Sequence, residues 1–161
     1  MLDINVKAEI GKSLAGLKLG SNLSMYLPYV DQIVDEHQVE WTIDIELDNK
    51  GILLYKFKDD ESILYFSEPR LELFFSNKGI LFSIRASYGY LGKIFEGGVK
   101  IGSRIGDIKH PLILDDTEDV HYLANGEDII EGILFFAGGL EVDEDPDSLI
   151  EEVRVYDYSL K

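Results

Sequence analysis

Carboxylates are the side chains with the greatest capacity for chemistry in this sequence, and they are concentrated in its last third. Between Asp115 and Lys161 there are fifteen Asp and Glu residues but only two bases, Arg154 and Lys161. The first 114 residues are nearly balanced, with 16 acids and 13 bases. Most of the net charge of −16 at pH 7 therefore comes from residues 115–161. A concentrated anionic surface attracts cationic partners and raises their association rate.

The segment 143–147 places carboxylates at alternate positions, as the first half of an EF-hand calcium loop does. The rest of that motif is absent, because its sixth position is Ser148 instead of glycine and its twelfth is Arg154 instead of glutamate. None of the three histidines has another histidine or a cysteine at metal-ligand spacing. We therefore expect a solvated acidic loop with at most weak affinity for divalent cations, and we predict no metal site and no cofactor.

No motif for covalent or phosphate chemistry is present. The chain has no cysteine and no Gly-x-Ser-x-Gly, so it lacks the common signatures of an activated nucleophile. Gly11-Lys12-Ser13 is similar to the end of a P-loop, but the glycine required five residues earlier is Val6. Asp44 and Glu46 could supply the carboxylates of a glycoside hydrolase, but alternate acids on a strand are more typical of a solvated face. We nominate no catalytic residue and expect a protein that is not an enzyme.

Two tyrosines are candidates for contact with a partner. Tyr88 and Tyr90 lie in the glycine-containing stretch Tyr-Gly-Tyr-Leu-Gly at 88–92. Tyrosine offers a large contact area at a small entropic cost, which suits an interface. Tyrosines that close the core between two halves of the chain would give the same pattern, so both interpretations remain open.

The elements that must position these residues are predicted by hydrophobic alternation. Residues 39–48 alternate apolar and polar over ten positions, which predicts a half-buried strand with four carboxylates on its wet face. Asn-Lys-Gly-Ile-Leu occurs twice, and glycine after Asn-Lys is typical of a hairpin turn. We predict a short strand at 62–67 and two hairpins, which pair 39–48 with 51–58 and 71–76 with 79–87.

A second repeat spans a longer distance. Gly16-Leu-Lys-Leu-Gly-Ser-Asn-Leu-Ser24 and Gly98-Val-Lys-Ile-Gly-Ser-Arg-Ile-Gly106 share the pattern Gly, apolar, Lys, apolar, Gly, Ser, any, apolar, small. The pattern predicts a short strand, a glycine turn and a short helix capped by Ser21 or Ser103. Helical spacing continues from Leu23 to Ile33, with Pro28 dividing this stretch into two short helices.

Strands are also predicted at 120–123, 129–136 and 149–158, so each repeat precedes a set of strands. We predict an α+β fold, mainly an antiparallel β-sheet with a few short helices. Two related helix-plus-hairpin units, about 10–90 and 92–161, would share one core. Because about eighty residues are marginal as an independent domain, residues 1–161 are expected to form a single domain.

Composition restricts the classes of partner. An acidic chain with a pI near 4.4 is a poor ligand for nucleic acid or for an anionic membrane, because phosphate recognition needs Lys and Arg. No apolar run approaches the roughly 20 residues of a membrane-spanning helix. The first residues lack a signal-peptide pattern, so we expect a cytoplasmic protein. We also expect it to be monomeric when free.

The two tandem glycine turns followed by hairpins, the absence of cysteine and the acidic C-terminal half together resemble small bacterial immunity proteins of contact-dependent growth inhibition and related polymorphic toxin systems. The resemblance implies a cytoplasmic, non-catalytic protein that binds one cognate toxin, in many cases a nuclease. The acids would occlude the basic groove of the toxin and the tyrosines would supply the packed centre. The predicted partner-binding residues are Asp115, Asp116, Glu118, Asp119, Glu141, Asp143, Glu144, Asp145, Asp147, Tyr88 and Tyr90.

Three alternatives stay open. The chain could be a small-ligand or carbohydrate-binding module, or a scaffold, without a toxin partner. It could be a carboxylate-dependent hydrolase, which two pocket carboxylates with separated pKa values would favour. A close relative of the first hypothesis is a mimic of DNA, in which rows of carboxylates follow phosphate spacing.

Overall fold

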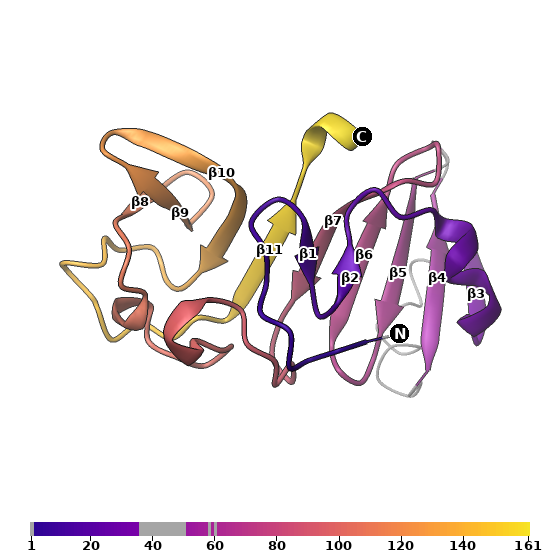
Figure 1. Cartoon of the computed structure of the whole chain (residues 1–161), viewed down its shortest axis with the longest axis horizontal. Coiled ribbons are helices and arrows are strands. Elements are labelled where there is room, and N and C mark those ends of the chain that lie inside the picture. Colours follow the sequence, from indigo (N-terminus) through magenta and orange to yellow (C-terminus); the bar gives the residue numbers. More distant parts are fainter. Residues whose placement is uncertain (1, 36–50, 58, 60) are drawn as a thin grey trace.

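A nine-stranded sheet organises the molecule in the computed structural model, which describes residues 2–35, 51–57, 59 and 61–161 (Figure 1). The strand order is β3-β4-β5-β6-β7-β11-β10-β9-β8. The strands are β3 (Gln32–Asp35), β4 (Ile52–Lys56), β5 (Ser62–Phe66), β6 (Leu71–Phe75), β7 (Leu81–Ala86), β8 (Leu112–Asp115), β9 (Val120–Asn125), β10 (Asp128–Phe136) and β11 (Glu152–Tyr156). A separate two-stranded sheet joins β1 (Ser13–Leu14) and β2 (Leu17–Lys18).

The helices of the described residues are single 3₁₀ turns. They are η1 (Leu23–Met25), η2 (Leu27–Tyr29), η4 (Glu96–Gly98), η5 (Ile105–Asp107) and η6 (Tyr158–Leu160). Each has only three residues, so these turns position the chain and add little helical stability of their own.

The alternation of apolar and polar residues explains the central strands. In β11, Val153 and Val155 are fully buried on one face, while Glu152 and Arg154 lie half-buried on the other. β6 follows the same rule, with Leu71, Leu73 and Phe75 in the core. The predicted 71–76/79–87 hairpin is confirmed by the pairing of β6 with β7, and Gly79 takes the positive φ of +72° that its turn needs.

One large core lies on one face of the sheet and receives residues from both halves of the chain. The hairpin β1–β2 crosses this face (Figure 1) and contributes the fully buried Leu14. Tyr26 packs edge-on against Phe75, with ring centroids 5.6 Å apart, and Phe95 packs in the same way against Phe135. The two halves of the chain therefore bury their apolar side chains together.

Strands β7 and β11 pair at the middle of the sheet, where the two halves of the chain meet. On the face opposite the large core, Arg85 of β7 forms an ion pair with Glu72 of β6. Its Nε lies 3.6 Å from Glu152 of β11, and Nη2 of Arg154 lies at the same distance from that carboxylate. Burial raises the pKa of Glu152, and the two cations only partly oppose this effect.

The two Gly-apolar-Lys-apolar-Gly-Ser segments form the same backbone contacts with these central strands. Gly20 donates to the carbonyl of Leu81 at 2.8 Å, and Gly102 donates to that of Ile150 at 2.7 Å. The return bonds run from Leu81 N to Ser21 O at 2.9 Å and from Ile150 N to Ser103 O at 2.8 Å. Gly20 and Gly102 have φ values of +83° and +85°. Both segments therefore dock in one geometry just before β7 and β11.

Several sequence expectations need correction. The large sheet is mainly antiparallel, as expected, but it is mixed, because β3 runs parallel to β4. Ile33 belongs to β3 and not to a helix, so the helical spacing that reached it was misleading. The helix caps are Asn22 and Arg104, one residue later than the predicted serines. The strand 39–48 and its hairpin pairing lie outside the described residues.

The other predicted strands are confirmed, with small shifts at their ends. Residues 62–67 form β5, and 120–123, 129–136 and 149–158 contain β9, β10 and β11. Pro28 separates two helical segments, as expected, although both are 3₁₀ turns. The edge strand β8 was missed, because its four residues are too few to show a clear alternation.

Candidate functional site

The structure brings the two acidic segments of the predicted site next to one another. Asp115 ends β8 and residues 116–119 form the turn to β9, while 141–147 lie in the connection between β10 and β11. His121 of β9 is fully buried, and its Nε2 lies 3.0 Å from the carbonyl oxygen of Leu140, so Nε2 carries the donated hydrogen. Asp119 packs against Gly139 so closely that a Cβ there would lie 2.7 Å from its Oδ1. The buried histidine thus connects the strand that follows the turn to the residue that precedes the loop.

The acidic loop is also attached to the second glycine repeat. Arg104 Nη1 lies 3.0 Å from Asp147 Oδ1, and Gly106 donates to the carbonyl of Pro146 at 3.0 Å. Within the loop, the Ser148 hydroxyl donates to Asp145 at 3.0 Å. In the described part of the chain, Asp147 is the one predicted partner-binding acid that takes part in an ion pair. The exposed residues among the other predicted acids include Asp116, Glu118, Glu141, Asp143 and Glu144.

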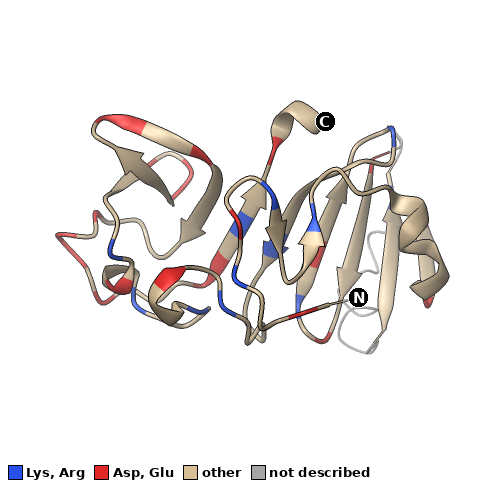
Figure 2. Ribbon diagram, viewed as in Figure 1, with Lys and Arg blue, Asp and Glu red and all other residues tan. Residues whose placement is uncertain are grey.

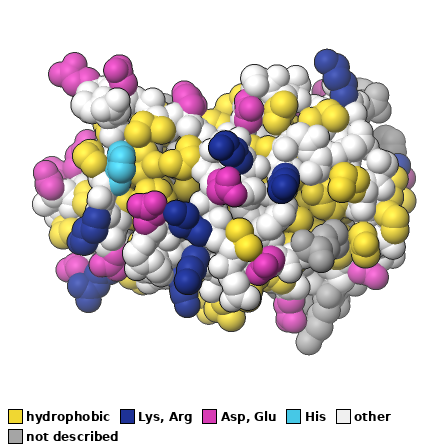
Figure 3. All heavy atoms as spheres, in the orientation of Figure 1, with side chains coloured by type: hydrophobic (Ala, Val, Ile, Leu, Met, Phe, Trp, Pro, Cys, Tyr) yellow, Lys and Arg dark blue, Asp and Glu magenta, His cyan; other side chains and the backbone are white. Residues whose placement is uncertain are grey.

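The distribution of charge is uneven but not one-sided. Figure 2 shows acidic positions along β10 and the loop before β11, at the end of the molecule that β8, β9 and β10 form. On the face that carries β1 and β2, Lys and Arg side chains lie among the acidic ones (Figure 3). Many acids of the C-terminal half therefore lie at one end of the molecule, while others, such as Glu152, lie at the middle of the sheet.

The two predicted tyrosines have different environments. Tyr88 is 83% exposed and lines a hollow of about 680 Å³ together with Pro69, Arg70 and Leu91. Tyr90 is only 1% exposed, so the expectation that it contacts a partner is wrong in this structure and it is a core residue. Burial, and to a smaller extent the charge of Asp3, raise the pKa of Tyr90 to about 12.

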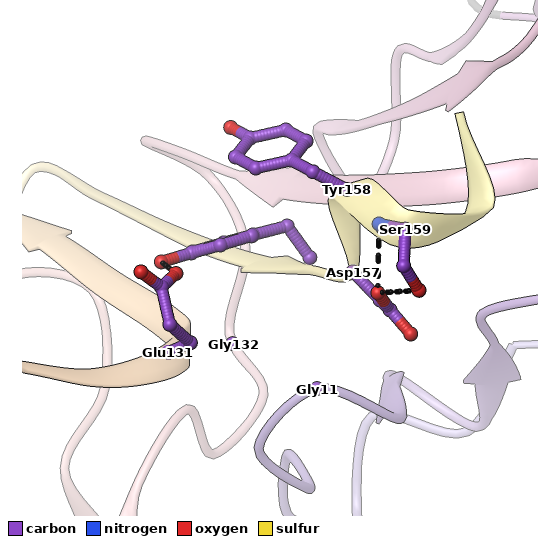
Figure 4. A pocket seen from close by; sticks show the side chains of 7 residues that line it. Gly11, Glu131, Gly132, Asp157, Tyr158 and Ser159 are labelled. Atoms are coloured by element: carbon purple, nitrogen blue, oxygen red, sulfur yellow. Dashed lines mark hydrogen bonds between the residues drawn. The ribbon is translucent and has the colours of Figure 1, made fainter.

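A pocket that the sequence analysis did not predict lies between the C-terminal turn and β10. Its volume is about 430 Å³, and it is lined by Gly11, Glu131, Gly132, Tyr156, Asp157, Tyr158 and Ser159 (Figure 4). The Tyr156 hydroxyl donates to Glu131 Oε2 at 2.8 Å. Asp157 Oδ1 accepts from the backbone nitrogen of Ser159 at 3.0 Å and from its hydroxyl at 2.6 Å. Tyr156 and Tyr158 are stacked, with ring centroids 4.6 Å apart.

Local backbone geometry positions the pocket. The pairing of β10 with β9 shifts register between Ile130 and Leu134, so the strand bends at Glu131 and Gly132. Gly132 has φ +107°, and a Cβ there would lie 2.7 Å from the nitrogen of Gly11. Gly11 donates to the carbonyl of Gly132 at 3.1 Å, which holds the N-terminal segment against the bend. The one available signal was the glycine inside the apolar run 129–136.

Burial and hydrogen bonding determine the protonation of the pocket at neutral pH. The pKa of Tyr156 is raised, mainly because the ring is buried and also because its hydroxyl donates to Glu131. The phenol therefore stays protonated and continues to fix one oxygen of the Glu131 carboxylate. The lining holds two carboxylates and no basic side chain, so the pocket is an anionic cavity with aromatic walls.

The described residues contain no group of three or more His, Cys, Asp and Glu side chains placed to hold a metal ion. Within the same residues, every helix is too short to cross a lipid bilayer.

The chain was also compared with known proteins. No protein-family model, no curated protein and no solved structure matches it. Its function must therefore be inferred from the geometry and chemistry of its own residues.

Proposed function

We propose that this protein is a non-catalytic acidic binding protein, which neutralises a cognate toxin by covering the basic active-site groove of that toxin. The proposal rests on the buried His121–Leu140 hydrogen bond, which links the strand after the first acidic segment to the residue before the second. It supports the inference that two carboxylate-rich segments, distant in sequence, face the partner together. The resemblance to immunity proteins implies the same activity.

Electrostatic complementarity provides the mechanism. The exposed Asp116, Glu118 and Glu144 would meet Lys and Arg side chains that line a nucleic-acid groove, and would raise the rate of association. Pairs at the centre of the interface become desolvated, so removal of one charge there costs about 2–5 kcal/mol, whereas pairs at the rim contribute little. Because the surface is already assembled, binding loses little conformational entropy.

The proposal extends to the organisation of the chain. We infer that the halves 10–90 and 92–161 are related units, since their glycine repeats dock identically and β7 meets β11 at the centre of the sheet. The protein is further proposed to be cytoplasmic and monomeric before it meets its partner. A small-ligand or carbohydrate-binding module is the alternative, which the aromatic pocket at Tyr156 and Tyr158 favours.

The test is calorimetric titration of the full chain with the product of the gene immediately upstream. We expect a 1:1 complex that weakens as salt rises, together with loss of the toxin's activity. The variant D116N/E118Q/E144Q should weaken binding at least about tenfold, which corresponds to about 1.4 kcal/mol. The control is E127Q/D128N, which removes two charges where the β9–β10 connection enters β10.

If neither the upstream product nor any basic nuclease domain binds, the proposal that the protein inhibits a toxin is wrong. Equal losses of affinity per removed charge in the two variants would indicate attraction to the net charge alone, and would exclude the two acidic segments as the binding surface.

A further inference from the structure

The pocket at the C-terminal turn has carboxylates that are fixed before any ligand arrives. Glu131 is held through Oε2 by Tyr156, and Asp157 is held through Oδ1 by Ser159. The remaining oxygen of each carboxylate has no hydrogen-bond partner in the described part of the chain. A carboxylate that is oriented in this way accepts a charged donor at a lower entropic cost than a freely rotating one.

The cavity has no cation of its own. No basic residue is among its lining side chains, and the nearby C-terminal Lys161 forms an ion pair with Glu61 at 3.1 Å. The same lysine Nζ lies 5.5 Å from the centroid of the Phe82 ring. The lining itself therefore carries negative charge without a cation, which favours a positively charged ligand.

The aromatic wall makes the chemistry of the ligand more specific. Tyr156 and Tyr158 both line the pocket and stack on one another, and Figure 4 shows the Tyr158 ring on the opposite side of the C-terminal turn from the Asp157 carboxylate. Figure 4 shows Glu131 and Asp157 on different sides of the pocket instead of converging on one point. A small metal ion needs converging oxygen ligands. A guanidinium group instead has a flat face for an aromatic ring and N–H donors along several edges.

We propose that this pocket binds an organic cation, namely the guanidinium group of an arginine side chain that a basic partner presents. The inference rests on the proposed function, since it names one specific contact of the protein with that partner. The arginine would donate to the free oxygens of Glu131 and Asp157, beside the Tyr156 ring that is part of the same lining. The pocket would therefore anchor the partner at a site separate from the joined acidic segments.

The test uses small probes and needs no partner protein. N-acetyl-arginine amide is titrated into the full chain while the backbone amide resonances are followed by NMR. We expect saturable shifts at Glu131, Gly132, Tyr158 and Ser159. N-acetyl-citrulline amide has nearly the same shape without the charge, and should bind at least about tenfold more weakly. N-acetyl-lysine amide should fall between them, because an ammonium group lacks the planar face.

Two variants connect the binding to the pocket. Glu131→Gln keeps an oxygen that accepts from Tyr156 but removes the charge, and should reduce affinity for the arginine probe at least about tenfold. Glu127→Gln removes an exposed acid of the β9–β10 turn, outside the pocket lining, and should leave that affinity unchanged. Thermal unfolding of both variants checks that each is folded.

Three results would overturn the inference. They are equal binding of the arginine and citrulline probes, shifts confined to residues 115–119 and 141–147, or tighter binding of a neutral methyl glycoside. The last result would support the carbohydrate-binding alternative. Because the upstream gene product is absent from this experiment, failure of the probe leaves the toxin-binding test unaffected. Failure of the toxin titration likewise leaves a positive probe result standing.

Discussion

The connections β6–β7 and β10–β11 hold corresponding positions in the two halves of the chain, but they differ greatly in length. After β6, the chain reverses through the short turn at 76–80 and enters β7. After β10, the residues 137–151 intervene before β11, and they carry all the acids of the second predicted segment. Each connection is held by a glycine repeat through equivalent bonds, Leu23 N to Gly79 O and Ile105 N to Ser148 O, both 2.8 Å. The same backbone contacts therefore hold a tight turn in one half and an acidic loop in the other.

The largest effect is expected from the buried residues that receive the two repeats. Leu81 and Ile150 are both fully buried. Each donates one backbone hydrogen bond to a glycine repeat and accepts one from it. Leu81→Ala and Ile150→Ala should each lower the free energy of unfolding by about 2–5 kcal/mol, because each leaves a cavity in the shared core. Urea denaturation measures both. A loss below about 1 kcal/mol for one of them alone would show that the two docking sites are not equivalent.

The next effect distinguishes the irregularities of the two halves. In β7, Phe82 is the extra residue where the pairing with β6 shifts, and it needs no positive φ. In β10, Gly132 has φ +107° and touches Gly11. Gly132→Ala should destabilise the protein by about 2–4 kcal/mol, from the unfavourable φ and overpacking together. It should also shift the NMR signals of the pocket residues. Full stability of this variant would contradict the assigned close approach.

The turn glycines of the repeats provide a finer comparison. A Cβ at Gly20 or at Gly102 would meet nothing within 4 Å, so the cost of alanine at either position comes from the positive φ alone. We expect Gly20→Ala and Gly102→Ala each to cost about 1 kcal/mol. Thermal unfolding of the two variants in the same buffer provides the measurement. Clearly unequal losses would mean that the segments differ in strain despite their matching hydrogen bonds.

The smallest effect concerns the seam between the halves and depends on pH. Burial raises the pKa of Glu152 above its usual value of 4.5. The folded state therefore binds the Glu152 proton more tightly than the unfolded state does. That contribution is complete below pH 4.5 and is lost as the pH rises through the folded-state pKa.

The stability of the wild type relative to Glu152→Gln should thus fall as the pH increases from about 4 to 7. Chemical denaturation at a series of pH values measures the difference. A rise over the same range would mean that the ion pairs with Arg85 and Arg154 outweigh burial.

The sequence predicted strands better than it predicted helices or sites. The alternation in 71–75 and the Asn-Lys-Gly turn are local signals, so the β6–β7 hairpin followed from them directly. The spacing from Leu23 to Ile33 looked helical, but Ile33 pairs in β3, because tertiary contacts override weak periodicity. Tyr88 and Tyr90 have the same local pattern, yet one is exposed and the other is buried. No local signal separates them.

The pocket could not be predicted from the sequence, because no local signal indicates which distant segments meet. Its lining comes from residues 11, 131–132 and 156–159, which are distant in sequence. The glycine at 132 indicated an irregular strand, but nothing near it indicated that Gly11 would lie against the bend or that Tyr156 would reach Glu131. The same holds for His121, whose bond to Leu140 joins the two acidic segments.

The sequence alone determined the excess of acids after Asp115, the strands that alternate, and the recurrence of one glycine pattern, because charge, period and turn chemistry are properties of short segments. The order of the strands in the sheet, the bond between His121 and Leu140, and the positions of the two pocket carboxylates depend on the tertiary structure. Burial and long-range strand pairing bring these groups together in space, and the distance between them along the chain does not predict that contact.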